Sequence, residues 1–219
     1  MYHDCVKRAD YEVPYKEAID LLTTLPGVDE RIAITGYSFG GYVALRVAMY
    51  DDRIKAVIPN PPQIDHGVSD KFWGGVVQKI PTFLLSWGLK RRLSKKPITE
   101  AMIEYSLWAL GLPHESLVDL LKDEEALSRA RSMKQEWNIK SDLHRITCPV
   151  LALVGGDEGE VVEQQAKEFL SLISSEEKRL HVFTLETDGS DDHCQLDNRA
   201  RGNQVMFDWL DEVFRLHED

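Results

Sequence analysis

Three kinds of residue that together can carry out acyl transfer occur along this chain in a consistent order. Ser38 stands between two glycines in the pentapeptide GYSFG, Asp157 and Glu158 follow in GGDEGE, and His193 comes last, in TDGSDDHCQLDN. A serine hydroxyl becomes nucleophilic at neutral pH when a histidine takes its proton and an acid orients that histidine. We therefore expect Ser38 to act as the nucleophile, His193 as the general base and one of the two carboxylates as the acid.

The surroundings of the pentapeptide decide whether it means anything, because G-x-S-x-G occurs by chance in about one chain of this length in fifteen. The β-branched segment Arg31–Thr35 predicts a short buried strand, and the almost wholly apolar segment Gly40–Tyr50 predicts a buried helix. A strand, a sharp turn and a helix form the nucleophile elbow of hydrolytic enzymes. Side chains at Gly36 and Gly40 would collide across that turn, and Gly41 is expected to leave room for close packing of the helix.

Two neighbouring carboxylates compete for the role of the acid. Counting from Pro149 with the strand-end spacing P-x-L-x-x-x-G-x-x-D places the acid at Glu158. The residue type favours Asp157, because aspartate is the commoner acid of such triads, and either carboxylate could orient His193. We expect Asp157, with Glu158 as the alternative.

The remaining pattern alternates strands and helices, which is typical of a parallel sheet with helices on both faces. Together with the order serine, acid, histidine, it predicts an α/β fold of the α/β-hydrolase type, with a mostly parallel sheet. The predicted strands and helices outside the elbow are a helix at Pro14–Leu25, strands at Arg53–Pro62, Cys148–Gly156 and Arg179–Glu186, and helices around residues 162–173 and 206–213.

Residues 63–145 differ in character from the rest of the chain. They contain four of the five tryptophans and many leucines, in helix-like segments that are broken at KKP and LGLP. We expect a helical cap or lid there, inserted into a core formed by residues 1–62 and 146–219. Aromatic side chains line many concave ligand sites, so Trp73 and Trp108, together with Tyr37 beside the serine, are candidate substrate contacts. Alternatively, any one of the tryptophans, including Trp87 and Trp137, attaches the cap to the core.

Composition excludes several kinds of partner. The chain has 219 residues, 43% of them hydrophobic, and a net charge of −11, which argues against nucleic acid or an anionic membrane as a partner. No apolar run approaches the ~20 residues that a membrane span needs. Three cysteines without C-x-x-C spacing indicate a reducing, cytoplasmic setting. We expect a small-molecule substrate, no metal and no cofactor.

The segments that surround Ser38 and His193 carry a resemblance to a known family. The stretch from DYEVPYKEAIDLL through GYSFGGYVALRVAMYDDRIKAVI, with DGSDDHCQLDN, resembles an α/β-hydrolase group of fungal secondary-metabolite pathways. This group includes the heptaketide-shortening hydrolases of pigment formation and the hydrolases of fusarin and cytochalasan clusters. The bacterial 2,6-dihydroxypseudooxynicotine hydrolase is more distantly similar. The resemblance implies a catalytic Ser38 and His193 that cleave an ester, or a carbon–carbon bond beside a ketone, in a polyketide-like molecule.

One departure from that family concerns the start of the fold. About thirty residues precede the elbow strand, whereas enzymes of this fold build several strands and an oxyanion loop there. We therefore expect an N-terminally incomplete fold whose elbow strand lies at a sheet edge, with the backbone N–H of Phe39 as the one oxyanion donor retained. The alternative to an active hydrolase is an impaired relative or fragment that at most binds such a ligand. A homodimer could form through the exposed sheet edge or the cap.

Overall fold

The structure is a computed structural model, and it describes residues 8–65, 108, 132 and 136–215. The chain divides into two compact units. One combines Met1–Ala9 with Asp65–Asn138, and the other combines Asp10–Ile64 with Ile139–Asp219. Most of the predicted cap lies outside the described residues, so its helical character stays a prediction.

The second unit contains a four-stranded parallel sheet in the order β1-β2-β3-β4. This confirms the predicted α/β class. The strands are β1 (Ile32–Tyr37), β2 (Ile54–Asn60), β3 (Val150–Gly155) and β4 (Lys178–Phe183). The helices are α1 (Glu12–Leu22), α2 (Phe39–Tyr50), α8 (Glu160–Leu172), α9 (Leu185–Asp188) and α10 (Arg199–Arg215), with the 3-10 turns η1 (Lys140–Arg145), η2 (Gly156–Glu158) and η3 (His193–Gln195).

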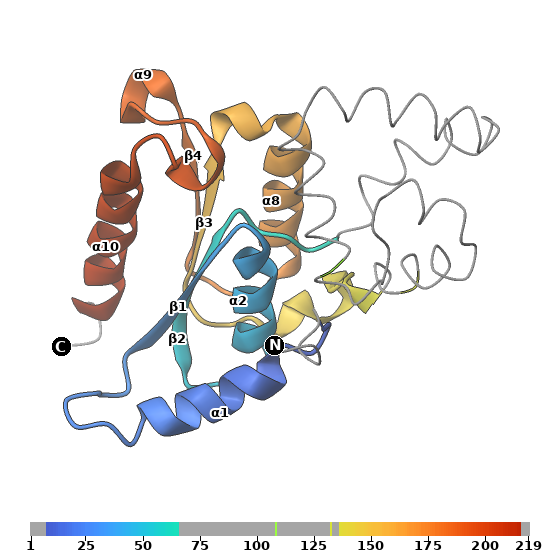
Figure 1. Ribbon diagram of the computed structural model, residues 1–219, viewed down its shortest axis with the longest axis vertical. Helices are drawn as coiled ribbons and strands as arrows, with labels where there is room; N and C mark the ends of the chain where they lie inside the picture. The colour runs from blue at the N-terminus through green and yellow to red at the C-terminus, as the bar shows by residue number, and fades with distance from the viewer. Residues whose placement is uncertain (1–7, 66–107, 109–131, 133–135, 216–219) are drawn as a thin grey trace. The chain divides into compact units, whose positions relative to one another are not determined.

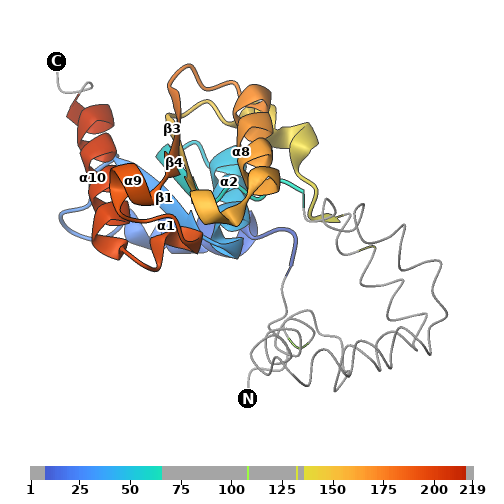
Figure 2. The same cartoon turned by 90° about the horizontal axis from the view of Figure 1, so that it is seen from above.

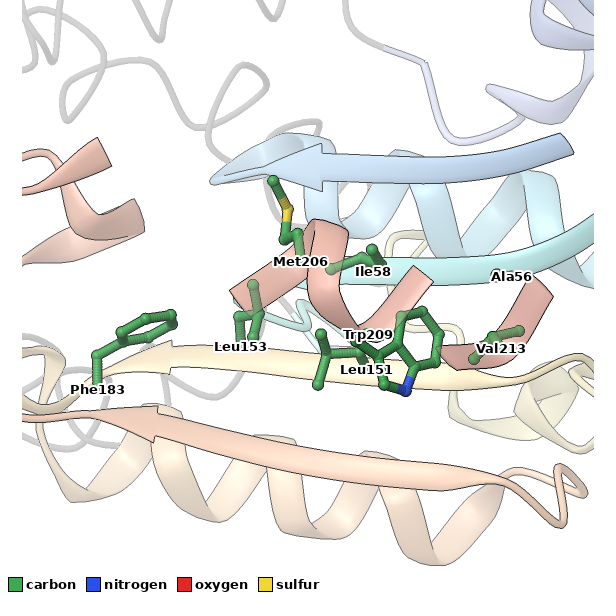
Figure 3. Packing of buried hydrophobic residues seen from close by; sticks show 8 residues of the cluster. All are labelled: Ala56, Ile58, Leu151, Leu153, Phe183, Met206, Trp209 and Val213. Carbon is green, nitrogen blue, oxygen red and sulfur yellow. The ribbon is translucent and has the colours of Figure 1, made fainter. Parts of the chain in front are cut away.

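Helices cover both faces of this sheet, with α2 and α8 on one face and α10 on the other (Figure 1 and Figure 2). On the α10 face, alternate strand residues such as Ile58, Leu151 and Leu153 pack against Trp209 and Met206 (Figure 3). Burying each such side chain stabilises the fold by about 1.5–3 kcal/mol. Because the strands are parallel, the carboxyl ends of all four lie at the same edge of the sheet, and the helices on both faces hold them there.

Several boundaries differ from the predicted ones for local reasons. The elbow strand runs to Tyr37 and α2 begins at Phe39, so a single residue makes the turn between them. The predicted fourth strand ends at Phe183 because Thr184 caps α9, its Oγ1 accepting the backbone N–H of Thr187 at 3.2 Å.

The apolar side chains of α1 are mostly exposed. Ile19 is the buried residue of this helix, whereas Leu21 is 65% exposed. An ion pair between Glu12 and Arg46 of α2 holds the helix in place instead. Among the described strands, β1 lies at the sheet edge, as expected; self-association through this edge stays a prediction.

None of the helices in the described ranges is both long enough and apolar enough to cross a membrane.

Candidate active site

Ser38 occupies the turn between β1 and α2 in a conformation that L-amino acids rarely adopt, with φ 55° and ψ −123°. Its backbone N–H donates to the carbonyl oxygen of Asn60, at the end of the neighbouring strand, over 2.8 Å. A Cβ at Gly36 would lie 1.8 Å from the carbonyl oxygen of Gly40, so the turn closes because residue 36 has no side chain. Strand, turn and helix therefore form the expected nucleophile elbow.

The prediction for Gly40 itself was wrong. A Cβ at Gly40 would meet nothing within 4 Å. The close approach is instead between the Cα of Gly36 and the carbonyl group of Gly40, so only residue 36 must lack a side chain. The prediction for Gly41 is confirmed, since a Cβ at that position would lie 2.0 Å from the carbonyl oxygen of Pro61.

His193 follows β4 and lies at the carboxyl edge of the sheet, as predicted. Its Nδ1 is 2.5 Å from Oε1 of Glu158, and the second carboxylate oxygen of Glu158 accepts the backbone N–H of Gly155 at 2.9 Å. The Glu158 side chain is 7% exposed, whereas that of His193 is 40% exposed. A carboxylate oxygen only accepts hydrogen bonds, so Nδ1 carries the proton and Nε2 is left as the basic nitrogen.

The preference for Asp157 as the partner of His193 is corrected by this geometry. Asp157 is exposed, and its backbone N–H donates to the carbonyl oxygen of Asp191 at 3.0 Å. The 3-10 turn η2 continues directly from β3 and brings the carboxylate of residue 158, not 157, back over the strand end. Spacing along the strand therefore indicated the carboxylate that contacts His193, whereas residue type indicated its neighbour.

Two further residues, Cys194 and Asn60, contact the site, and no role is predicted for either of them from the sequence. The thiol of Cys194 lies 3.4 Å from Nε2 of His193 and donates to the carbonyl oxygen of Asn60 at 3.2 Å. Burial raises the pKa of this thiol to about 11, so it stays protonated at neutral pH. The position of Cys194 next to the loop histidine was the only sequence signal, and Asn60 carried none.

Tyr37, the residue before Ser38, contacts side chains of α10. Its hydroxyl lies 3.6 Å from Sδ of Met206 and 3.5 Å from Oδ1 of Asn203, and the guanidinium of Arg199 lies over its ring at 4.2 Å. Burial raises the pKa of its phenol. Tyr37 therefore packs the sheet against α10, and a contact between its half-buried side chain and a substrate stays a prediction.

The tryptophan predictions remain open. Trp108 is helical and 59% exposed, and Trp137 is buried; both belong to the unit that does not contain Ser38. Trp73 and Trp87 lie outside the described residues. Substrate contacts by Trp73 and Trp108 stay a prediction.

Phe39, the proposed source of an oxyanion donor, is the first residue of α2. The role of its backbone N–H as an oxyanion donor stays a prediction. The Phe39 ring is held between Tyr11, edge-on at 5.6 Å, and Tyr42, stacked at 5.5 Å. Within the described ranges, no group of three His, Cys, Asp or Glu side chains could bind a metal ion.

A parallel sheet with a serine elbow after one strand and a carboxylate–histidine pair after two others is the arrangement of an α/β hydrolase. The model of the alpha/beta hydrolase family matches residues 6–200, so the chain belongs to this family.

Named relatives and solved structures agree with that assignment. Hydrolase LUC6 of Fusarium sp is 26% identical over 216 residues, covering 87% of this chain and 45% of its own. The 20-hydroxy-prefusarin hydrolase FUS2 of Gibberella moniliformis is 26% identical over 243 residues, covering 97% and 51%. The crystal structure of the 2,6-dihydroxy-pseudo-oxynicotine hydrolase shares the fold, with a TM-score of 0.59 and 23% identity over 94% of this chain and 46% of that one. The expected resemblance is confirmed, and the chain spans about half the length of these relatives.

Proposed function

We propose that this chain carries the triad of a serine-dependent hydrolase, with Ser38 as nucleophile, His193 as general base and Glu158 as the acid that orients it. The hydrogen bond of 2.5 Å between His193 and the buried carboxylate of Glu158 is the observation that carries this proposal. A buried carboxylate held by a backbone N–H has a fixed position, so it holds the imidazole in the tautomer that a general base requires.

In the proposed reaction, Oγ of Ser38 attacks the substrate carbonyl carbon and its proton passes to Nε2 of His193. The backbone N–H of Phe39 stabilises the negative charge on the former carbonyl oxygen. The tetrahedral intermediate then collapses, and the bond from the former carbonyl carbon to the leaving group breaks. The imidazolium protonates this leaving group, which is an alkoxide for an ester or an enolate carbon for a bond beside a ketone. Water, deprotonated by His193, releases the acyl group from Ser38.

For the substrate we propose a polyketide-like small molecule, processed in secondary-metabolite biosynthesis inside the cell. The support comes from the relatives, two of which are named as hydrolases of multiply oxygenated small molecules, a 20-hydroxy-prefusarin and a 2,6-dihydroxy-pseudo-oxynicotine. Both Cys148 and Cys194 are free thiols, which fits a reducing compartment. Assaying short esters against β-diketones separates C–O from C–C cleavage.

A fluorophosphonate probe tests the nucleophile directly. We expect mass spectrometry to locate the phosphonyl group on Ser38, and Ser38→Ala to abolish labelling. Ser171→Ala, which changes an exposed serine on α8, serves as the matched control and should label like the parent. Labelling that persists in Ser38→Ala would overturn the proposal. If the protein binds a polyketide-like ligand but is not labelled, it is instead the impaired relative that only binds such a ligand.

A further inference from the structure

Three non-glycine residues in the described part of the chain have left-handed backbone conformations. They are Ser38 with φ 55°, Cys194 with φ 55° and Gln195 with φ 52°. Such a conformation is unfavourable for a residue with a side chain and persists only where the surrounding structure enforces it. Two of the three flank His193 on its C-terminal side, and the third is the proposed nucleophile.

All three of these residues form a hydrogen bond with one buried residue, Asn60, through its main chain or its side chain. The carbonyl oxygen of Asn60 accepts the N–H of Ser38 at 2.8 Å and the thiol of Cys194 at 3.2 Å. Its side-chain Nδ2 donates to Oε1 of Gln195 at 2.7 Å. Asn60 ends β2, which lies between the elbow strand and β3, so it stands between the nucleophile and the histidine loop.

The amide pair of Asn60 and Gln195 is poorly suited to stabilise the fold. Both residues are fully buried, and within the described residues neither Oδ1 of Asn60 nor Nε2 of Gln195 has a hydrogen-bond partner. Burying an amide group that is only half satisfied costs free energy. The pair therefore contributes position rather than net stability.

We infer that Asn60 is a positioning residue that fixes the nucleophile elbow and the histidine loop relative to each other. Its main chain sets Ser38, and its side chain, through Gln195, sets the loop that carries His193. This inference rests on the proposed function, in which Ser38 and His193 act together.

The direct test is Gln195→Met, which removes the side-chain hydrogen bond but keeps a long unbranched side chain. The first readout is the low-field NMR resonance of the His193 Nδ1 proton, which reports the bond to Glu158 and needs no catalysis. The second is the rate at which a fluorophosphonate labels Ser38. We expect the resonance to broaden or disappear, and labelling to slow by about 10- to 100-fold, since small misplacements of reacting groups have effects of this size.

Val213→Ala is the matched control, because Val213 is fully buried near the C-terminal end of α10, in the hydrophobic cluster between this helix and the sheet. It should lower thermal stability and leave both readouts at parental values. Asn60→Ala and the double mutant Asn60→Ala/Gln195→Met should change the two readouts no more than Gln195→Met alone does. Each variant removes the same hydrogen bond, that between the side chains of Asn60 and Gln195. If Asn60→Ala does not fold, Gln195→Met against Val213→Ala still decides the matter.

Parental resonance and labelling in Gln195→Met would overturn the inference. An unlabelled parent protein would instead refute the proposed function, and the NMR comparison would still test the positioning role.

Discussion

Replacing Glu158 by glutamine tests the orienting acid with the smallest change in shape. The carboxylate now serves two donors, Nδ1–H of His193 at 2.5 Å and the backbone N–H of Gly155 at 2.9 Å. An amide has only one acceptor oxygen. If that oxygen stays on Gly155, the amide N–H faces Nδ1, which must then accept, and the imidazole proton moves to Nε2. In that tautomer Nε2 cannot take the proton of Ser38, so we expect a loss of about 10⁴-fold in turnover.

Asp157→Asn is the matched control for Glu158→Gln, because it makes the same chemical change one residue away, on an exposed side chain. Exposed substitutions change free energies by about 0.5 kcal/mol or less, which is about twofold in rate. Fluorophosphonate labelling rates and ester hydrolysis, compared among the two variants and the parent, measure both effects. A steep loss in Asp157→Asn with a mild effect in Glu158→Gln would refute the assignment, and two mild effects would refute the acid–base mechanism itself.

Two further predictions concern stability. Gly36→Ala places a Cβ 1.8 Å from the carbonyl oxygen of Gly40 and should destabilise the protein by about 3 kcal/mol or more; Gly40→Ala, with open space around its Cβ, should be neutral or stabilising by up to ~1 kcal/mol in urea unfolding. Burial alone would raise the pKa of Asp188, but hydrogen bonds from Thr187, from Arg201 and from a backbone N–H outweigh it and hold the pKa below 3.8. The resulting stabilisation is present above about pH 4 and is lost as pH falls through the folded-state pKa. Asp188→Asn should therefore lower the free energy of unfolding by about 2 kcal/mol at pH 7 and by progressively less in acid. Asp211→Asn, on the exposed side of α10, should change it little. Urea midpoints that show the same difference at pH 7 and pH 3 would contradict the second prediction.

The order of elements and the placement of Ser38 and His193 could be predicted from the sequence because both depend on local signals. A β-branched run before GYSFG and an apolar run after it specify the strand and the helix without reference to distant residues. The parallel sheet then brings a loop after β4 to the same edge, whatever the loop's own sequence.

The identity of the acid could not be settled in the same way, because it depends on one turn. Asp157 and Glu158 differ by a single position, and only the 3-10 turn η2 determines which carboxylate points back toward Gly155. The packing of Tyr37 was not predicted for a similar reason. Its neighbour along the chain is Ser38, the proposed nucleophile, but Tyr37 points to α10, because successive strand residues point to opposite faces.

Glycines that take no part in the proposed reaction shape the backbone around Ser38 and His193. A Cβ at Gly155, the last residue of β3, would lie 2.4 Å from the carbonyl oxygen of Asp192 and 2.6 Å from that of Asp191, so the histidine loop rests directly on the end of this strand. The same backbone N–H of Gly155 holds the carboxylate of Glu158. One glycine thus lets the loop of His193 approach and fixes the acid that His193 contacts, as Gly36 lets the elbow of Ser38 close. Two backbones that approach this closely leave no room for a side chain, so the contact between Glu158 and His193 depends on a glycine at the end of β3. An aspartate or a glutamate near Gly155 would have to reach both the Gly155 N–H and His193 to serve as the proposed acid.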